Sequence, residues 1–150
     1  MRLLLRASAA SAVVALLLSL AACGENDVDS YCSDLTSARK ELAEMVNSDS
    51  ASALLGNLPL LHDLADAAPE DVADEWQVFL RALDGLDQSL EDAGVEPSDF
   101  VDGKPPEGLS AADGKGIADA VAQVQSEEVV AAANGIEQQG RDVCKVNLGL

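Results

Sequence analysis

The residues of this chain that could do chemistry are few: one histidine, His62, and three cysteines among 27 acidic residues. A catalytic group of nucleophile, histidine and carboxylate would have to use His62. No G-x-S-x-G turn presents a serine, and Asp66 lies one helical turn beyond the histidine. We therefore interpret His62 as a surface or half-buried side chain paired with Asp66, with a haem or metal ligand as the alternative.

The sequence also lacks the short motifs that hold metals, phosphates and nucleotides. It contains no C-x-x-C, H-E-x-x-H, P-loop or G-x-G-x-x-G pattern, and no E-x-x-H pair of the kind found in di-iron bundles. Carboxylates are so frequent that no pair is distinguished as a general acid and base. We expect no catalytic residue, no metal and no cofactor, and hence a protein that is not an enzyme.

Residues 1–22 have the composition of a cleaved export signal. Arg2 and Arg6 give a positive start, residues 7–20 have no charge, and small residues follow. A membrane-spanning helix is the alternative. It is disfavoured because the apolar run is shorter than the roughly 20 residues that a span needs.

The end of this segment resembles the lipobox of bacterial lipoproteins. Leu20, Ala21, Ala22 and Cys23 supply an aliphatic residue, two small residues and a cysteine. The resemblance implies cleavage before Cys23 and a diacylglyceryl thioether on its sulfur. Because two or more acyl chains anchor a protein stably, we predict attachment to the extracytoplasmic face of the cell membrane through Cys23 and a short tether at 23–26. The alternative is a soluble secreted protein.

Cys32 and Cys144 remain as an even pair once Cys23 bears lipid. An exported protein meets oxidising conditions that favour disulfides. We predict a Cys32–Cys144 disulfide, which would stabilise the fold by about 4–5 kcal/mol in the loop-entropy description. A two-cysteine metal site is the alternative, and no histidine lies near enough in sequence to support it.

The charge of the chain excludes some partners. The formal net charge is −18, and loss of Arg2 and Arg6 with the signal would make the mature protein more acidic still. Binding to nucleic acid needs lysine and arginine to neutralise phosphates, so we expect no nucleic-acid partner. The excess indicates a solvated, self-repelling surface, or alternatively an acidic face for a basic protein partner.

Apolar residues at helical spacing predict an all-α fold. The first helix starts near Val28 and ends at 47–50. Its apolar stripe consists of Val28, Cys32, Leu35, Leu42 and either Met45 or Val46, beside Tyr31 and Ala38. A leucine-rich segment at 50–68 should break near Gly56 and restart with Asn57 as cap. The third helix begins after Pro69 and stops at Gly94, with Trp76 and Phe79 as core anchors.

Residues 95–110 have no period and are rich in proline and glycine, which predicts a long loop. A helical pattern then returns and slips phase before Glu127, so Ser126 should start a new or kinked helix. The expected apolar positions of this region are Ile117, Val121, Val124, Val130, Ala133, Ile136 and Cys144.

Together these segments predict one domain, residues 27–146, behind the signal. About five helices in four layers would form a small up-down bundle stapled by the disulfide. The disulfide would mark the membrane-proximal end, and the 95–110 loop would point outward.

A family resemblance supports this outline. Tyr31-Cys32 near the start, the stretch Ala67–Trp76 in the middle and a single cysteine near the end are similar to the uncharacterised small lipoproteins of actinobacteria. The resemblance implies location and helical build, and no activity.

Two functions follow from these observations. The first is a lipid-anchored interaction module or envelope accessory that contacts an unknown protein partner through the 95–110 loop and nearby acidic helix faces. The alternative is a carrier that holds a small apolar ligand, such as haem or a lipid-like molecule, between helices. Its ligand would contact His62, Tyr31 and Met45.

Overall fold

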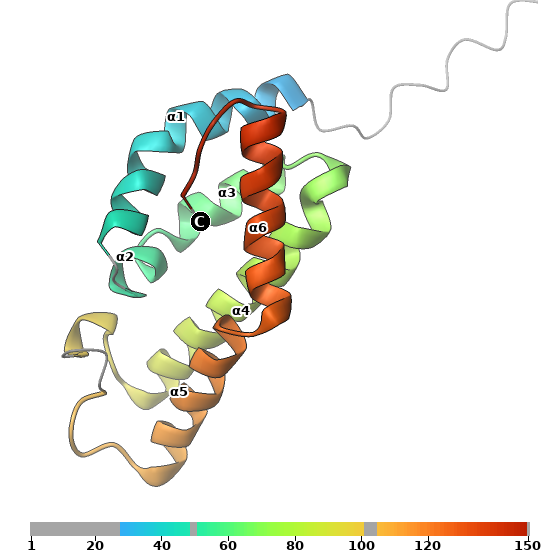
Figure 1. Ribbon diagram of the computed structural model, residues 1–150. Helices are drawn as coiled ribbons and strands as arrows, with labels where there is room; N and C mark the ends of the chain where they lie inside the picture. Colours follow the sequence, from blue (N-terminus) through green and yellow to red (C-terminus); the bar gives the residue numbers. More distant parts are fainter. Residues whose placement is uncertain (1–27, 49–50, 101–104, 150) are drawn as a thin grey trace, which may run out of the picture.

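The structure is a computed structural model that describes residues 28–48, 51–100 and 105–149, and every regular element in these ranges is helical (Figure 1). The α-helices are α1 (Val28–Asn47), α2 (Ala51–Leu55), α3 (Leu58–Ala67), α4 (Glu70–Ala93), α5 (Ala111–Val124) and α6 (Glu127–Asp142). The all-α prediction is confirmed, with six α-helices in the described ranges where about five were expected. The predicted signal peptide, Cys23 and the tether lie outside these ranges.

Helix α4 begins and ends where its sequence signals indicate. Glu70 and Asp71 place negative charge at the positive end of the helix dipole. Gly94 takes the left-handed conformation, with φ of 64°, and its N–H donates to the Glu91 carbonyl at 3.0 Å. This ending favours glycine, because a side chain is strained at positive φ.

The leucine-rich segment breaks as predicted, and α2 and α3 meet at Gly56 and Asn57. Asn57 occupies the N-cap position of α3, but its side chain makes no capping hydrogen bond. The Asn57 amide donates instead to the Ala53 carbonyl at 2.7 Å. The expected side-chain cap is therefore wrong, because the end of α2 competes for the same amide.

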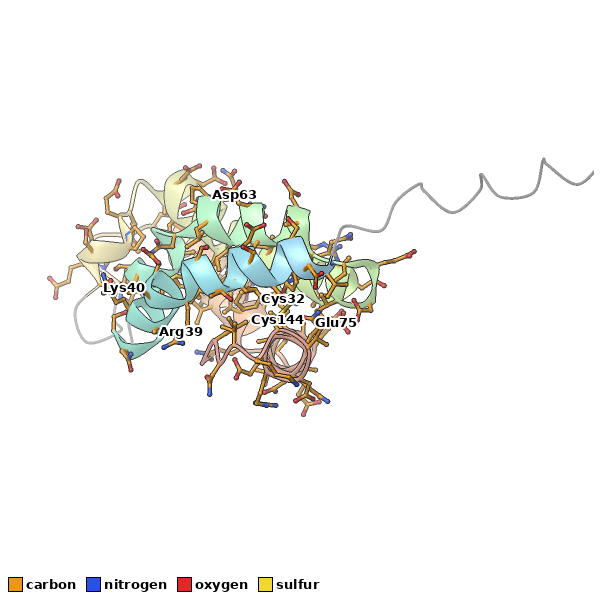
Figure 2. All side chains as sticks on the ribbon, turned by 90° about the horizontal axis from the view of Figure 1, so that it is seen from above. Cys32, Arg39, Lys40, Asp63, Glu75 and Cys144 are labelled. Atoms are coloured by element: carbon orange, nitrogen blue, oxygen red, sulfur yellow. A yellow bond between two sulfur atoms is a disulfide. The ribbon has the colours of Figure 1, made fainter. Side chains whose placement is uncertain are left out.

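Two helical hairpins form the bundle. Helix α1 lies beside α3, and α4 packs against α5 and α6. Figure 1 shows α5 and α6 following one another along α4, so the chain continues past Ser126 without reversing. In Figure 2 α6 is seen end-on while α1 runs across the view, so the two hairpins cross steeply.

The described parts of loop 95–110, residues 95–100 and 105–110, lie at the far end of the molecule from the start of α1 (Figure 1). Part of it is regular: Pro97–Asp99 forms the 3-10 helix η1, which the sequence analysis did not predict. Glu96 and Asp99 cap this turn reciprocally, and residues 101–104 lie outside the described ranges.

The core is centred on the single tryptophan and the single tyrosine. Trp76 and Tyr31 are both fully buried. The Trp76 Nε1–H donates to the Tyr31 hydroxyl at 2.8 Å, so α1 and α4 are joined by a hydrogen bond inside the core. Phe79 packs edge-on against Trp76, with ring centroids 6.3 Å apart. The prediction that Trp76 and Phe79 are core anchors is confirmed.

The buried stripe of α6 lies one position from the predicted one. Val129 and Ala132 are buried, whereas Val130 is 50% exposed. Ile136 belongs to both patterns, and alanines at 131–133 give little hydrophobic contrast, so periodicity could not separate them. Val28, the first residue of the predicted apolar stripe of α1, is 40% exposed.

A C-terminal strap, residues 145–149, follows α6 and returns over the bundle (Figure 1). Val146 and Leu148 are buried, so the core extends past the predicted boundary at residue 146. A Cβ on Gly140 would lie 3.2 Å from the Leu148 side chain. The glycine therefore leaves room for the strap to pack closely on α6.

Candidate functional site

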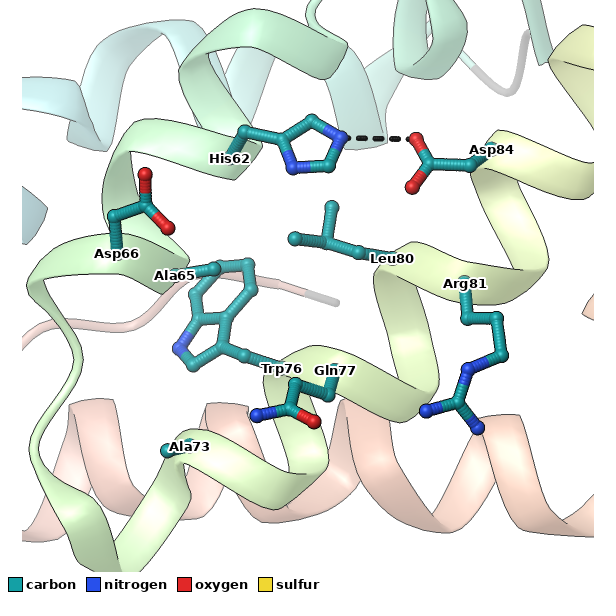
Figure 3. Close-up of a pocket in the computed structure, with 9 residues that line it drawn as sticks. All are labelled: His62, Ala65, Asp66, Ala73, Trp76, Gln77, Leu80, Arg81 and Asp84. Atoms are coloured by element: carbon teal, nitrogen blue, oxygen red, sulfur yellow. Dashed lines mark hydrogen bonds and ion pairs between the residues drawn. The ribbon is translucent and has the colours of Figure 1, made fainter.

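His62 and Asp66, which the sequence analysis considered together, both line an open groove between α3 and α4 (Figure 3). The groove has a volume of about 410 Å³. Its polar lining consists of His62, Asp66, Gln77, Arg81 and Asp84, and its apolar lining of Ala65, Ala73, Trp76 and Leu80.

His62 pairs across this groove. Its Nε2 lies 2.9 Å from Asp84 Oδ1 of α4, and the two side chains are 46% and 47% exposed. The predicted half-exposed histidine is found, and Asp84 is a partner that the sequence analysis did not name. The turn at Ala68 and Pro69 folds α4 back beside α3, which brings a residue 22 positions away opposite the imidazole. A pair as exposed as this contributes at most about 1 kcal/mol.

The groove carries charged and polar side chains but no side-chain hydroxyl or thiol. No serine, threonine or cysteine is among its lining residues. Arg81 supplies a positive charge there, and Figure 3 shows its guanidinium directed away from the His62–Asp84 pair.

The structure does not unite Tyr31, Met45 and His62 into one ligand site. Tyr31 and Met45 are core residues, 0% and 5% exposed. They lie 14 residues apart on α1, which corresponds to about 21 Å of helix. His62 faces the outer groove, so a single small ligand contacting all three would have to displace core side chains.

Burial also changes the acid–base behaviour of Tyr31. Removal from water raises the pKa of its hydroxyl to about 12, and the nearby Asp71 charge acts in the same direction, while the Trp76 hydrogen bond opposes both. The hydroxyl is therefore protonated at neutral pH and acts as a structural acceptor.

The predicted Cys32–Cys144 disulfide is present (Figure 2), with a Cα–Cα distance of 4.9 Å. It links the start of α1 to the residue that precedes the C-terminal strap and spans 112 positions. The third cysteine, Cys23, lies outside the described residues, so its lipidation stays a prediction. Within the described ranges no helix is long and apolar enough to cross a membrane.

Sequence reasoning missed one buried acidic residue, Glu137. Its Oε2 accepts hydrogen bonds from the N–H groups of Leu148 and Gly149 at 3.0 and 2.9 Å. Arg141 lies 3.4 Å from Oε1. Glu137 thus holds the C-terminal strap on α6, and the only signal in the sequence was an acidic residue beside the apolar position Ile136.

Comparison of the chain with known proteins identifies no relative. No protein-family model, curated protein or solved structure matches the chain. Among the described residues no group of three or more histidine, cysteine or acidic side chains is placed to hold a metal ion. The resemblance to small actinobacterial lipoproteins therefore stays a prediction.

Proposed function

We propose that this chain is a lipid-anchored helical protein on the extracytoplasmic face of the cell membrane, where it binds other proteins and does not act as an enzyme. The observation that best supports this proposal is the Cys32–Cys144 disulfide. Structural disulfides persist in oxidising compartments outside the cytoplasm. The basic and apolar segment 1–22 and Cys23 behind it are the features that would direct export and anchoring.

The surface chemistry favours binding. The acidic excess leaves the helix faces negatively charged, and the His62 groove offers paired polar groups without a hydroxyl or thiol. A partner with a basic surface would be attracted over distance, and its association would weaken as salt rises.

Metabolic labelling in a bacterial host tests the anchor. We expect the wild-type chain to incorporate an alkyne-bearing palmitate and to sediment with membranes. Cys23→Ala should be unlabelled and should leave the membrane fraction. The matched control, Cys32→Ser with Cys144→Ser, should keep the label because it retains Cys23. A wild-type chain that is unlabelled and soluble would overturn the proposal.

A further inference from the structure

A second groove runs between α1 and α3, on a side of α3 that the His62 groove does not use. It has a volume of about 540 Å³. Asp34 and Glu41 of α1 and Asp63 of α3 line its rim. Figure 2 looks down on α1 and α3 lying side by side, with Asp63 on α3.

The floor of this groove is apolar. Ala38, Leu60 and Leu64 line it, and Ala38 and Leu64 are anchored in the core at 6% and 2% exposure. The α1 wall from Asp34 to Glu41 covers seven residue steps, or about 10 Å of helix axis. The groove therefore has acidic edges about two helical turns long on α1 and a short apolar floor, of which half-buried Leu60 is the most accessible residue.

The acidic edges have no compensating charge. No lysine or arginine lines the groove, and within the described ranges Asp34, Glu41 and Asp63 form no ion pair. The cations of α1 lie elsewhere: Arg39 falls roughly 140° around the helix from Asp34. Lys40 pairs with Glu44 at 3.2 Å. The His62 groove differs, because Arg81 lines it.

We propose that the α1–α3 groove docks a basic amphipathic helix of a partner protein. Apolar side chains at three- and four-residue spacing would lie on half-buried Leu60, with Leu64 and Ala38 behind it, the helix-in-groove mode of recognition. Flanking lysines or arginines would reach the carboxylates of Asp34, Glu41 and Asp63. This inference rests on the proposed function as an interaction module and assigns the surface that performs it.

The groove chemistry selects a basic protein helix over other occupants. Anionic lipid headgroups would be repelled by three uncompensated carboxylates. An extended peptide added to a sheet edge needs exposed strand backbone, and the described residues contain only helices and connecting segments. The apolar floor adds contact area that a simple inorganic cation would not use.

The test uses the full chain in a non-ionic detergent and a fluorescent model helix of leucine, alanine and lysine. The peptide has about 15 residues, enough to form a helix when bound. A second peptide with glutamate at every lysine position is the probe control. Fluorescence anisotropy at low and high salt gives the dissociation constants, and amide NMR shifts locate the bound peptide.

Three substitutions in the groove, Asp34→Asn, Glu41→Gln and Asp63→Asn, should weaken binding of the lysine peptide by about tenfold or more. The same three substitutions should also make the dissociation constant of the lysine peptide depend less on salt concentration. The matched control, Asp74→Asn, Glu75→Gln and Glu128→Gln, neutralises the three carboxylates of the separate α4–α6 groove. It should change the affinity by less than about threefold, since it alters only the general field.

Equal weakening by both triple variants would overturn the inference, because net charge alone would then explain binding. So would the absence of binding, or NMR shifts that avoid Ser37, Leu60 and Leu64. An unchanged far-ultraviolet spectrum shows that each variant remains folded. Membrane attachment is read separately by palmitate labelling, so failure of the groove and failure of the proposed function give different results.

Discussion

At the scale of single residues, three polar side chains in or near the core differ in whether they have partners. Tyr31 accepts a hydrogen bond from Trp76, and Glu137 accepts two from the C-terminal strap. Gln139 is 9% exposed, and neither end of its amide has a hydrogen-bond partner in the described structure. Because an unpaired buried polar group costs more than a paired one, these residues should respond differently to substitution and pH.

Because Tyr31 is buried, we expect the stability of the fold to decrease at alkaline pH. Its pKa is about 12 in the folded chain against an ordinary 10.0, so the folded state holds the proton more tightly. The free energy of unfolding is unaffected by this group below pH 10, and falls by about 2–3 kcal/mol as pH rises through 12. Tyr31 is the only tyrosine, so tyrosinate absorbance reports it alone. We expect a midpoint near 12 when folded and near 10 in denaturant; a folded midpoint near 10 would contradict the buried placement.

Gln139 should be replaceable with a gain in stability. Gln139→Met keeps the length of the side chain and removes two unpaired polar atoms, so we expect the free energy of unfolding to rise by about 1 kcal/mol. Urea denaturation measures the change. The neighbouring exposed position provides the control, and Gln138→Met should stay within about 0.5 kcal/mol of wild type. A loss of stability in Gln139→Met would show that the amide has a partner.

At the scale of elements, the C-terminal strap depends on a single carboxylate. Glu137→Gln leaves one neutral oxygen to accept from both backbone N–H groups, turns an NH₂ group toward Arg141 and removes the charge that strengthens these bonds, so we expect a loss of about 1–3 kcal/mol. Amide exchange at Leu148 and Gly149 should accelerate. Glu91→Gln, at an exposed site on α4, is the control and should be nearly neutral. Unchanged exchange in the strap would contradict the role assigned to Glu137.

Local sequence signals predicted the helix boundaries better than they predicted contacts between helices. Pro69, Gly94 and Ser126 act on their own backbone neighbours, and each marks a helix end where expected; the Ser126 hydroxyl accepts from Val129 N at 3.3 Å. The partner of His62 and the strap held by Glu137 depend on how distant segments pack. The spacing of apolar residues along one helix carries no information about which residues of another segment it contacts. In α6 even the buried face was ambiguous, because the helix is rich in alanine near its start.

At the scale of the whole molecule, the disulfide and the α3–α4 packing join the two crossing hairpins. Replacing both Cys32 and Cys144 by serine removes a link between positions 112 residues apart. We expect the free energy of unfolding to fall by about 4–5 kcal/mol, chiefly through the freer unfolded chain. Urea denaturation of the oxidised and double-serine chains measures this difference. Coincident unfolding curves would show that the link does not constrain the unfolded state.

The central claim is that this helical domain is exported, oxidised and anchored by lipid. The most direct measurement is the intact mass of the chain purified from bacterial membranes without reductant. The account predicts a chain that begins at Cys23, with added mass for an acylated glyceryl group and the loss of two hydrogens for Cys32–Cys144. A spectrum showing residues 1–150, or residues 23–150 without added lipid, would contradict it.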